Sequence, residues 1–285
     1  MVKIKLTKED LLSLPELYRS GLSSWILAKK FNTDHSNILK HLKKQGVHIR
    51  SRSCAAKQGV MAGRIKIKRN EIPKNLELNE DLAYILGVLA GDGYMDFNDK
   101  RRTHYIGLSA TDKEFVEKFK NSLHDFFNIS PSNEFRRSKH LKWHDQYITR
   151  LCSKDACNFI NFIGQFKKEN WRVSDIIKNS EDSIKCSFIK GFFDSEGEID
   201  KKIWRIGATS MNLVGLKELG QLLDSLEIRY TITKIKDNRP NTHQKYRLRI
   251  QDKYSIILFK KLIGFTIIRK QKVLYGAFPR DRLTP

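Results

Sequence analysis

Two segments of the chain share one pattern of apolar, small and acidic positions, 104 residues apart. Residues 84–93 read YILGVLAGDG and residues 188–197 read FIKGFFDSEG. Each is an apolar run of helical type in which small residues recur four positions apart, and this spacing lets two helix backbones approach closely. An internal repeat in register predicts two similar halves that meet at one centre. We therefore expect two helices packed through the small residues Gly87, Gly91, Gly191 and Ser195.

Each run ends in an acid followed by glycine, Asp92–Gly93 and Glu196–Gly197. A glycine just past a helix end predicts a left-handed C-terminal cap. That end of a helix carries partial negative charge, so a carboxylate there is unfavourable, and two such carboxylates repel each other. A bound divalent cation relieves both effects. The alternative is a pair of buried amphipathic helices with solvated end acids, which explains one copy but not two in register.

ILGVLAGDG and IKGFFDSEG resemble the paired signatures of the single-chain LAGLIDADG homing endonucleases, over roughly residues 80 to 278. The resemblance implies an α+β fold class: two pseudo-symmetric αββαββα halves with saddle-shaped antiparallel sheets that grip DNA. It also implies Mg²⁺-dependent cleavage of both strands of a long double-stranded target, with Mn²⁺ able to substitute. Carried over by residue, the catalytic acids are Asp92 and Glu196, and the expected metal site adds Gly91 and Ser195.

The remainder of each half also repeats. A strand at residues 103–109 and a helix at 113–123 are matched at residues 203–208 and 213–223. Residues 146–152 are matched by 245–251, and each of these strands precedes an apolar helical stretch. The later strand alternates, with Tyr246, Leu248 and Ile250 on one face and Lys245, Arg247 and Arg249 on the other. The apolar face of such a strand packs on the hydrophobic core, and its cationic face is exposed to solvent or to a ligand.

The charge of the chain favours a polyanionic partner. Its formal net charge is +22 and its pI is about 9.8. Neutralising phosphates releases counterions, so double-stranded DNA is the expected partner. The sequence lacks a long uncharged apolar run and a signal peptide, which argues against a membrane. The cations expected to contact DNA in the two halves are Arg101, Arg102, Arg136, Arg137, Lys201, Lys202, Arg205, Lys234, Lys236, Arg247 and Arg249.

The first 70 residues form a separate basic segment, with 16 Lys+Arg against 4 Asp+Glu. Residues 17–31 and 36–46 resemble a helix-turn-helix unit, whose second helix enters the major groove. The candidate base-reading residues are His35, Ser36, Asn37, Lys40 and His41. The alternative is a small helical bundle that adds core or contacts a protein. Residues 47–74, including Arg50 and Arg52, are expected to form a basic linker that orders mainly on DNA.

These observations predict four segments. They are a helix-turn-helix domain at residues 1–50, a basic linker at 51–74, the first half at 75–180 and the second half at 181–285. Both halves lie in one chain, so we expect a monomer.

The four cysteines are too few and too scattered for a disulfide scaffold. This usage favours a reducing intracellular setting, cytoplasmic or organellar, rather than secretion. One spacing is metal-like, since His140 and His144 precede Cys152 and Cys157. This spacing is compatible with a zinc site. However, Cys152 ends a predicted strand that leads into a helix containing Cys157, and this arrangement favours a core position for both cysteines.

The family resemblance also implies a Lys or Gln near each acid to position the attacking water. The strand ends offer Ala110 in the first half and Ala208 or Thr209 in the second, which departs from that pattern. Residues 267–272, IIRKQK, resemble a family lysine-glutamine signature and make Lys270 the catalytic candidate of the second half. Residues 166–172 are its weaker counterpart. Because the sequence departs from the family pattern at these positions, one expectation is slow cleavage, or faster cleavage of one DNA strand than of the other.

Three functions fit these observations: a site-specific endonuclease with an added DNA-binding module, a transcription regulator that has lost cleavage, and an RNA-binding intron maturase. The presence of both Asp92 and Glu196 favours cleavage, because a protein that only binds has no need of two repelling acids.

Overall fold

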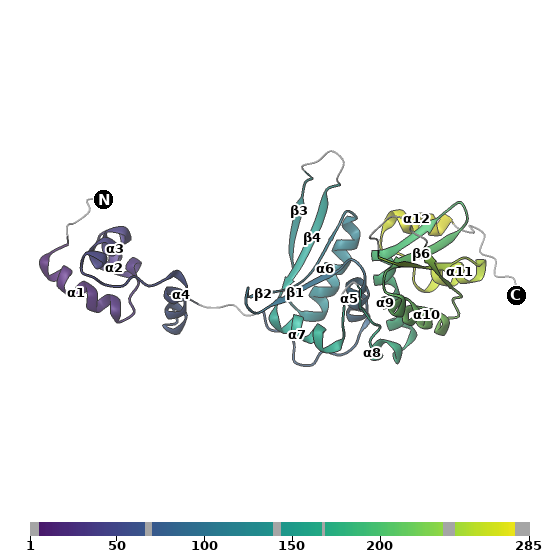
Figure 1. The fold of residues 1–285 in the computed structure, drawn as a ribbon, viewed down its shortest axis with the longest axis horizontal. Helices are drawn as coiled ribbons and strands as arrows, with labels where there is room; N and C mark the ends of the chain where they lie inside the picture. Colours follow the sequence, from purple (N-terminus) through teal and green to yellow (C-terminus); the bar gives the residue numbers. More distant parts are fainter. Residues whose placement is uncertain (1–5, 66–69, 139–143, 167–168, 236–242, 277–285) are drawn as a thin grey trace. The chain divides into compact units, whose positions relative to one another are not determined.

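The computed structural model describes residues 6–65, 70–138, 144–166, 169–235 and 243–276 (Figure 1). His140 and Lys236, two of the residues singled out above, lie outside these ranges. The chain divides into two compact units, Met1–Arg69 and Asn70–Pro285. Within the described residues, no helix has the length and apolar character needed to cross a membrane.

The N-terminal unit is all-helical and has its own core. Helices α1 (Lys8–Arg19), α2 (Ser24–Lys30) and α3 (His35–Lys44) pack around Leu14, Leu27, Ile38 and Leu42, each with a relative exposure of 0%. A capping box starts α1, because Thr7 and Asp10 satisfy each other's backbone N–H groups. A short turn at residues 31–34 joins α2 to α3, so this pair has the predicted order of helix, turn and helix.

The segment predicted as a linker is partly folded. Ser51 caps helix α4 (Arg52–Met61), because its hydroxyl accepts a hydrogen bond from the Cys54 N–H. The Arg50 guanidinium lies 3.8 Å from the Tyr18 ring and donates to the Leu22 carbonyl and to Gln58 of α4. The prediction that the linker orders mainly on DNA is therefore wrong for residues 52–61, because local capping and these long-range hydrogen bonds fold them onto the first three helices.

The second unit contains the predicted duplication. Its first half runs α5 (Glu80–Ala90), β1 (Tyr94–Asn98), β2 (Thr103–Ala110), α6 (Lys113–Phe127), β3 (Ser132–Arg136), β4 (Gln146–Cys152) and α7 (Lys154–Ile163). A short helix, α8 (Asp175–Lys178), precedes the second half. That half runs α9 (Asp182–Glu196), β5 (Gly197–Asp200), β6 (Arg205–Ser210), α10 (Leu213–Ser225), β7 (Thr231–Ile235), β8 (Lys245–Ile250), α11 (Lys253–Leu262) and α12 (Ile268–Gly276). The α+β class with two αββαββα halves is confirmed, and α12 is an addition to the second half.

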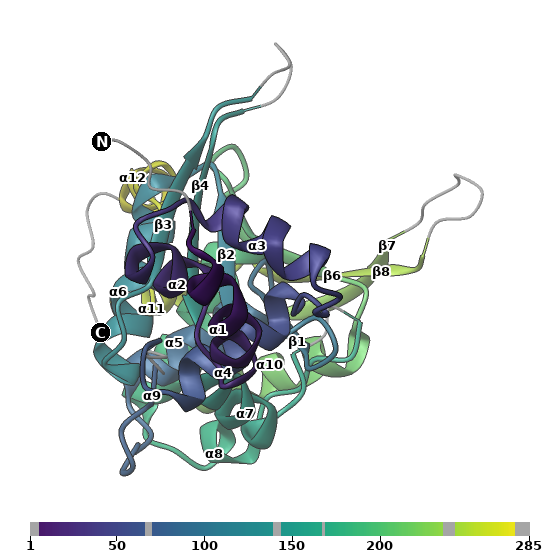
Figure 2. The same ribbon diagram turned by 90° about the vertical axis from the view of Figure 1, so that its left-hand side faces the viewer.

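Each half contains one antiparallel four-stranded sheet, in the order β1-β2-β4-β3 or β5-β6-β8-β7. Paired residues share a face. Leu108 opposite Thr149, and Ala208 opposite Leu248, are fully buried, so this face of each sheet packs on the core. The opposite face, which we call the open face, carries polar and charged side chains. The hairpins β3–β4 and β7–β8 both extend outward (Figure 2).

Helices α5 and α9 lie side by side at the junction of the halves (Figure 1). Further contacts join the halves, since the Arg269 guanidinium of α12 donates hydrogen bonds of 2.8 and 2.9 Å to Asp112, which precedes α6. Arg172 donates a hydrogen bond of 2.6 Å to Glu218 of α10. Part of the segment assigned to the first half from the sequence therefore packs on the second.

Candidate active site

The helices α5 and α9 approach to backbone contact at two glycines. A Cβ atom on Gly87 would collide with the Phe188 carbonyl oxygen, and one on Gly191 would collide with the Tyr84 carbonyl oxygen. At the next turn, a Cβ on Gly91 would lie 2.9 Å from the Ser195 hydroxyl oxygen. The sequence prediction that these four small residues form the helix interface agrees with this geometry.

Gly93 and Gly197, the glycines after the acids, do not form the predicted left-handed helix caps. Gly197 has φ −76° and Gly93 is not among the residues with positive φ, so neither forms a left-handed cap. A Cβ on Gly93 would instead lie 2.9 Å from the Val88 carbonyl oxygen, and one on Gly197 would collide with the Phe193 carbonyl oxygen. The cap prediction is wrong because the chain turns back against the last turn of each helix, where only glycine fits.

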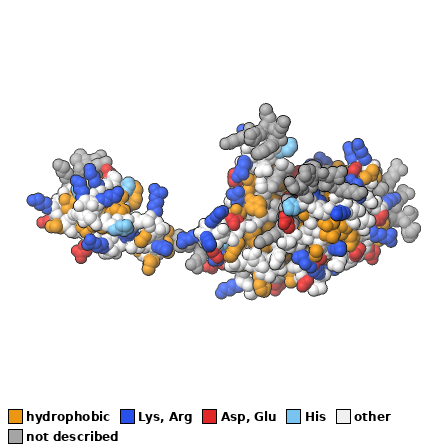
Figure 3. All heavy atoms as spheres, viewed as in Figure 1, with side chains coloured by type: hydrophobic (Ala, Val, Ile, Leu, Met, Phe, Trp, Pro, Cys, Tyr) orange, Lys and Arg blue, Asp and Glu red, His pale blue; other side chains and the backbone are white. Residues whose placement is uncertain are grey.

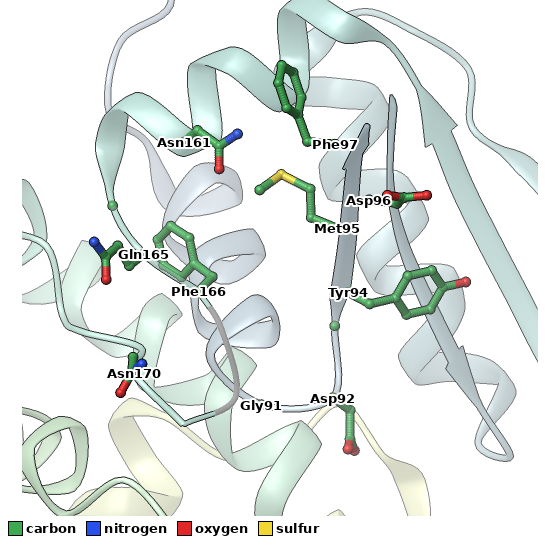
Figure 4. A pocket seen from close by; sticks show the side chains of 12 residues that line it. Gly91, Asp92, Tyr94, Met95, Asp96, Phe97, Asn161, Gln165, Phe166 and Asn170 are labelled. Atoms are coloured by element: carbon green, nitrogen blue, oxygen red, sulfur yellow. The ribbon is translucent and has the colours of Figure 1, made fainter. Parts of the chain in front are cut away.

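The two acids stand at the adjoining ends of these helices. Asp92 is exposed in the turn after α5, and Glu196 is the half-buried last residue of α9. A Cβ on Gly91 would lie 3.2 Å from the Glu196 Cγ, so the residue before Asp92 lies next to the second acid with no room for a side chain. Asp92 is among the residues that line a cavity of about 930 Å³, but its side chain points away from Met95 and Phe166, which line the same cavity (Figure 4).

The donor set at these helix ends consists of oxygen atoms. The candidates are the carboxylates of Asp92 and Glu196 and the backbone carbonyls of Gly91 and Ser195, since the last carbonyls of a helix have no intrahelical donor. No group of three or more His, Cys, Asp or Glu that could hold a metal occurs in the part of the chain that the structure describes. Mg²⁺ characteristically binds one or two carboxylates and completes its shell with water and substrate phosphate, so this set fits it.

Lys245 lies beside Glu196 and is a further candidate, which the sequence alone did not indicate. A cavity of about 220 Å³ is lined by Lys245 together with Glu196, Ala90 and residues 209–211. Tyr246 pairs with Ser210 as Tyr147 pairs with Ala110, so Gln146 holds the equivalent position in the first half. From the sequence alone, the expected Lys or Gln lies at the ends of β2 and β6, whereas Lys245 and Gln146 belong to β8 and β4. These residues begin the neighbouring strands, and only the strand register reveals this.

Lys270, the predicted catalytic lysine, is buried against the end of α9. Its ammonium donates hydrogen bonds of 3.2 Å to the Phe193 carbonyl and 2.8 Å to the Asp194 carbonyl. Burial lowers the pKa of Lys270 from 10.5 to about 8, although the Asp194 carboxylate opposes this. Lys270 also lines a cavity with Ser195 and Glu198, so it adjoins the predicted metal site.

A second buried polar group joins the halves beneath the acids. The Asp194 carboxylate, with 1% relative exposure, accepts hydrogen bonds of 2.8 Å from the Tyr84 hydroxyl of α5 and from the Thr266 N–H. Burial raises the pKa of Asp194, against the effect of these hydrogen bonds. Nothing in the sequence pattern distinguished this residue from the solvated acids.

The predicted cationic face of β8 is present. Arg247 pairs with Thr209 and Arg249 with Gly207, so both lie on the open face, while Leu248 and Ile250 are fully buried. Arg205 lies on the same face, opposite Asp200. The Arg247 Nε is 3.6 Å from Glu198, and Arg205 is 3.6 Å from Asp200.

The other predicted DNA contacts are distributed more widely. Arg101, Arg102, Lys201 and Lys202 are exposed in the turns β1–β2 and β5–β6, and Arg136 and Arg137 are exposed at the end of β3. Lys234 pairs with Tyr246, so it lies on the face opposite to Arg247. In the N-terminal unit, His35 of α3 stacks on the exposed Trp25 at 3.9 Å, and Ser36 and Lys40 are exposed.

Two further residues of that unit differ in exposure, since Arg50 is turned inward, as described above, whereas Arg52 is exposed. Asn37 donates a hydrogen bond of 3.0 Å to Thr33, and His41 is half-buried. Figure 3 shows that Lys and Arg side chains outnumber acids on the visible face of this unit.

The cysteines do not form a metal site in the described residues. Cys157 is fully buried in α7, and burial raises the pKa of its thiol to about 12, which disfavours the thiolate that zinc requires. Cys152 is exposed, so its predicted core position is wrong, because its strand position places it on the open face with Arg150.

The repeated halves, joined through glycine-rich helices that end in acids, define a two-motif protein of the LAGLIDADG class. A model of the LAGLIDADG-like domain matches residues 79–164 and again residues 183–264, more than half of the chain. The chain therefore belongs to the LAGLIDADG-like domain family.

The chain is also similar to individual proteins. An uncharacterized protein of Methanocaldococcus jannaschii is 34% identical over 181 residues, 61% of this chain and 64% of the relative. A second uncharacterized protein of that organism is 28% identical over 265 residues, 84% of this chain and 90% of the relative. The chain thus spans just under two thirds of the first relative and most of the second.

The crystal structure of I-DmoI in complex with DNA and Ca superimposes with a TM-score of 0.50 at 20% identity, covering 69% of this chain and 97% of that chain. At this level of identity the likeness concerns the fold.

Proposed function

We propose that the protein is a site-specific endonuclease that cleaves both strands of a long double-stranded DNA target. The observation that carries the proposal is the placement of Asp92 and Glu196 at adjoining helix ends, one from each copy of the repeat, where Gly91 lies next to Glu196. Two carboxylates at the negative ends of two helices are unfavourable without a cation. The family membership and the crystallisation of I-DmoI with DNA support the same proposal.

The oxygen donors at the two helix ends would hold Mg²⁺, with Mn²⁺ as a substitute. The residues are Asp92 and Glu196 through their carboxylates and Gly91 and Ser195 through their carbonyls. When bound, the metal would supply an activated water and neutralise charge on the leaving oxygen. Lys245, in the cavity beside Glu196, would orient the scissile phosphate or the water of one strand. Gln146 takes the equivalent position for the other strand, and Lys270 would hold the end of α9 in place.

DNA would lie across the open faces of the two sheets. The cations Arg205, Arg247 and Arg249 lie on one of these faces, and exposed basic turns adjoin both. The N-terminal unit would extend the recognised site, with the exposed residues of α3 in a major groove. Since one chain supplies both halves, the active species is a monomer.

The test is a cleavage assay with the uninterrupted DNA that surrounds the insertion point of the protein's own gene, in Mg²⁺ and in Mn²⁺. Asp92→Asn and Glu196→Gln should each lower cleavage by ~100-fold or more while leaving DNA affinity near wild type. The exposed acids of α6 provide matched controls, Asp125→Asn and Glu117→Gln, which should cut normally. Wild-type cleavage rates in either site variant would refute the metal assignment. A wild-type protein that binds the target but cuts in neither metal would instead be a regulator, and preferential binding of intron RNA would indicate a maturase.

A further inference from the structure

The two sheets carry one arginine each at the same place on their open faces. In the first half, Gly107 of β2 pairs with Arg150 of β4. In the second half, Gly207 of β6 pairs with Arg249 of β8. Gly107 also pairs with Tyr94, and Gly207 with Glu198, so these two neighbours are equivalent as well. The repeat therefore allows the surroundings of two equivalent arginines to be compared directly.

Arg150 is held by its own sheet. Its Nε donates a hydrogen bond of 3.2 Å to the Tyr94 hydroxyl, and its guanidinium lies 5.7 Å from the centre of the Tyr105 ring. A third neighbour, Glu134 of β3, has a carboxylate oxygen 4.0 Å from the same guanidinium. Figure 4 shows that Tyr94 points to the opposite side of β1 from Met95, which places it on the open face with Arg150. Arg150 thus has a hydrogen-bond acceptor, an aromatic face and a counter-charge within the protein.

Each of these three neighbours is a different residue type around Arg249. The residues equivalent to Tyr94, Tyr105 and Glu134 are Glu198, Arg205 and Thr233. Glu198 lies 3.6 Å from the Arg247 Nε. The Arg249 Nε is buried and has no hydrogen-bond acceptor among the residues that the structure describes, and the same is true of the Arg205 Nε.

A buried N–H without an acceptor is costly, and such groups in native proteins call for a specific explanation. An arginine that turns outward from the open face exchanges this orphaned donor for acceptors on a ligand. The planar guanidinium donates two parallel hydrogen bonds, and in the DNA major groove the matching acceptor pair is O6 and N7 of guanine.

We propose that Arg249 reads a guanine in the half-site bound by the second sheet, whereas Arg150 is a structural residue that reads no base. The proposal rests on the DNA-binding function proposed above and adds the chemistry of one half-site. The two half-sites are consequently unlike: the near-symmetry of the protein does not extend to a palindromic target.

The experiment is selection from a library of randomised DNA duplexes by the full chain, for wild type, Arg249→Ala, Arg249→Lys and the matched control Arg150→Ala. Wild type should select a non-palindromic consensus with a guanine in one half. Arg249→Ala should lose the preference at that position by about 10- to 100-fold and keep the other positions. Arg249→Lys should lose it too while keeping the salt dependence of affinity, because lysine retains the charge but not the bidentate geometry.

Arg150→Ala should keep the whole consensus and show a lower melting temperature. An unchanged consensus for Arg249→Ala and Arg249→Lys overturns the assignment of Arg249 while the proposed function stands. Loss of base preference in Arg150→Ala equally overturns the distinction between the two arginines. If wild type selects no consensus at all, sequence-specific DNA binding falls and this assignment falls with it.

Discussion

The Lys270 ammonium donates a hydrogen bond of 2.8 Å to the Asp194 carbonyl, two residues before the catalytic candidate Glu196. This contact places a cation at the negative end of α9, where its charge is favourable. Burial nevertheless lowers the pKa of Lys270 from 10.5 to about 8. The lysine therefore stabilises the position of the helix end at some expense in folding free energy when it is protonated.

This lowered pKa predicts a pH dependence of stability. The unfolded chain binds the Lys270 proton more tightly than the folded protein, so below pH 8 the charged lysine destabilises the fold. As the pH rises from about 8 to 10.5 that cost is relieved, and stability should gain up to roughly 3 kcal/mol from this group. Urea unfolding at several pH values should show the gain in wild type and its absence in Lys270→Met. An identical pH dependence in both proteins would contradict the low pKa.

Lys245 should matter for cleavage and little for folding. It is exposed and lines the cavity that contains Glu196, so Lys245→Met removes a charge from the site without disturbing the core. We expect kcat to fall by roughly 10-fold or more while the melting temperature stays near wild type. Lys261→Met, at an exposed position in α11, is the control and should cut normally. Equal rates for the two variants would place Lys245 outside the reaction.

Enlarging Gly191 should separate the halves. Its Cβ would collide with the Tyr84 carbonyl, a backbone atom that cannot move aside, so Gly191→Leu should cost about 1–3 kcal/mol or more. Gly276→Leu is the matched control, because a Cβ there meets nothing within 4 Å. Thermal unfolding should show a loss of several degrees for the first variant only. A melting temperature unchanged in Gly191→Leu would remove this glycine from the helix contact.

Glu218 should make the protein sensitive to acid. Burial opposes its ionisation, but hydrogen bonds from Arg172, Lys178 and the Val173 N–H outweigh burial and lower its pKa from 4.5 to about 2. The resulting stability is present above pH 4.5 and is lost as the pH falls towards 2, with a magnitude of roughly 2–3 kcal/mol. Glu218→Gln should be less stable than wild type at pH 7, and the difference should shrink in acid. The exposed Glu77→Gln removes the same charge and should show neither effect.

Removal of the N-terminal unit should shorten the recognised site without abolishing cleavage. Each unit has its own hydrophobic core, so residues 70–285 should fold alone. Asn70 is retained because it donates a hydrogen bond of 2.9 Å to the Cys152 carbonyl. We expect weaker binding and a DNase footprint that is shorter on one side only. A full-length footprint from the shortened protein would mean that the N-terminal unit does not contact DNA.

The sequence was sufficient for features that repeat or alternate. The repeat located α5, α9 and both acids, and the alternation along β8 separated Arg247 and Arg249 from Leu248. Contacts between residues far apart in the chain have no such repeating pattern in the sequence, so they could not be predicted from it. Arg50 looked like one more basic residue, but Tyr18 and Gln58 hold it inside the N-terminal unit. The sequence pattern correctly places Gly93 and Gly197 just after two helices, but the left-handed cap that it predicts is wrong. Their close approach to the helix backbone has no signature in the local sequence.

The buried hydrogen bond between Tyr84 and Asp194 makes the two halves non-interchangeable at their interface. The position equivalent to Tyr84 in the second copy is Phe188, and the one equivalent to Asp194 in the first copy is Ala90. A homodimer of second halves would set each Asp194 against a phenylalanine, and the buried carboxylate would keep only the hydrogen bond from the Thr266 N–H of its own half. A homodimer of first halves would leave the Tyr84 hydroxyl facing alanine. Each half is therefore the specific partner of the other, and a second copy of the same half would leave a buried polar group without its partner.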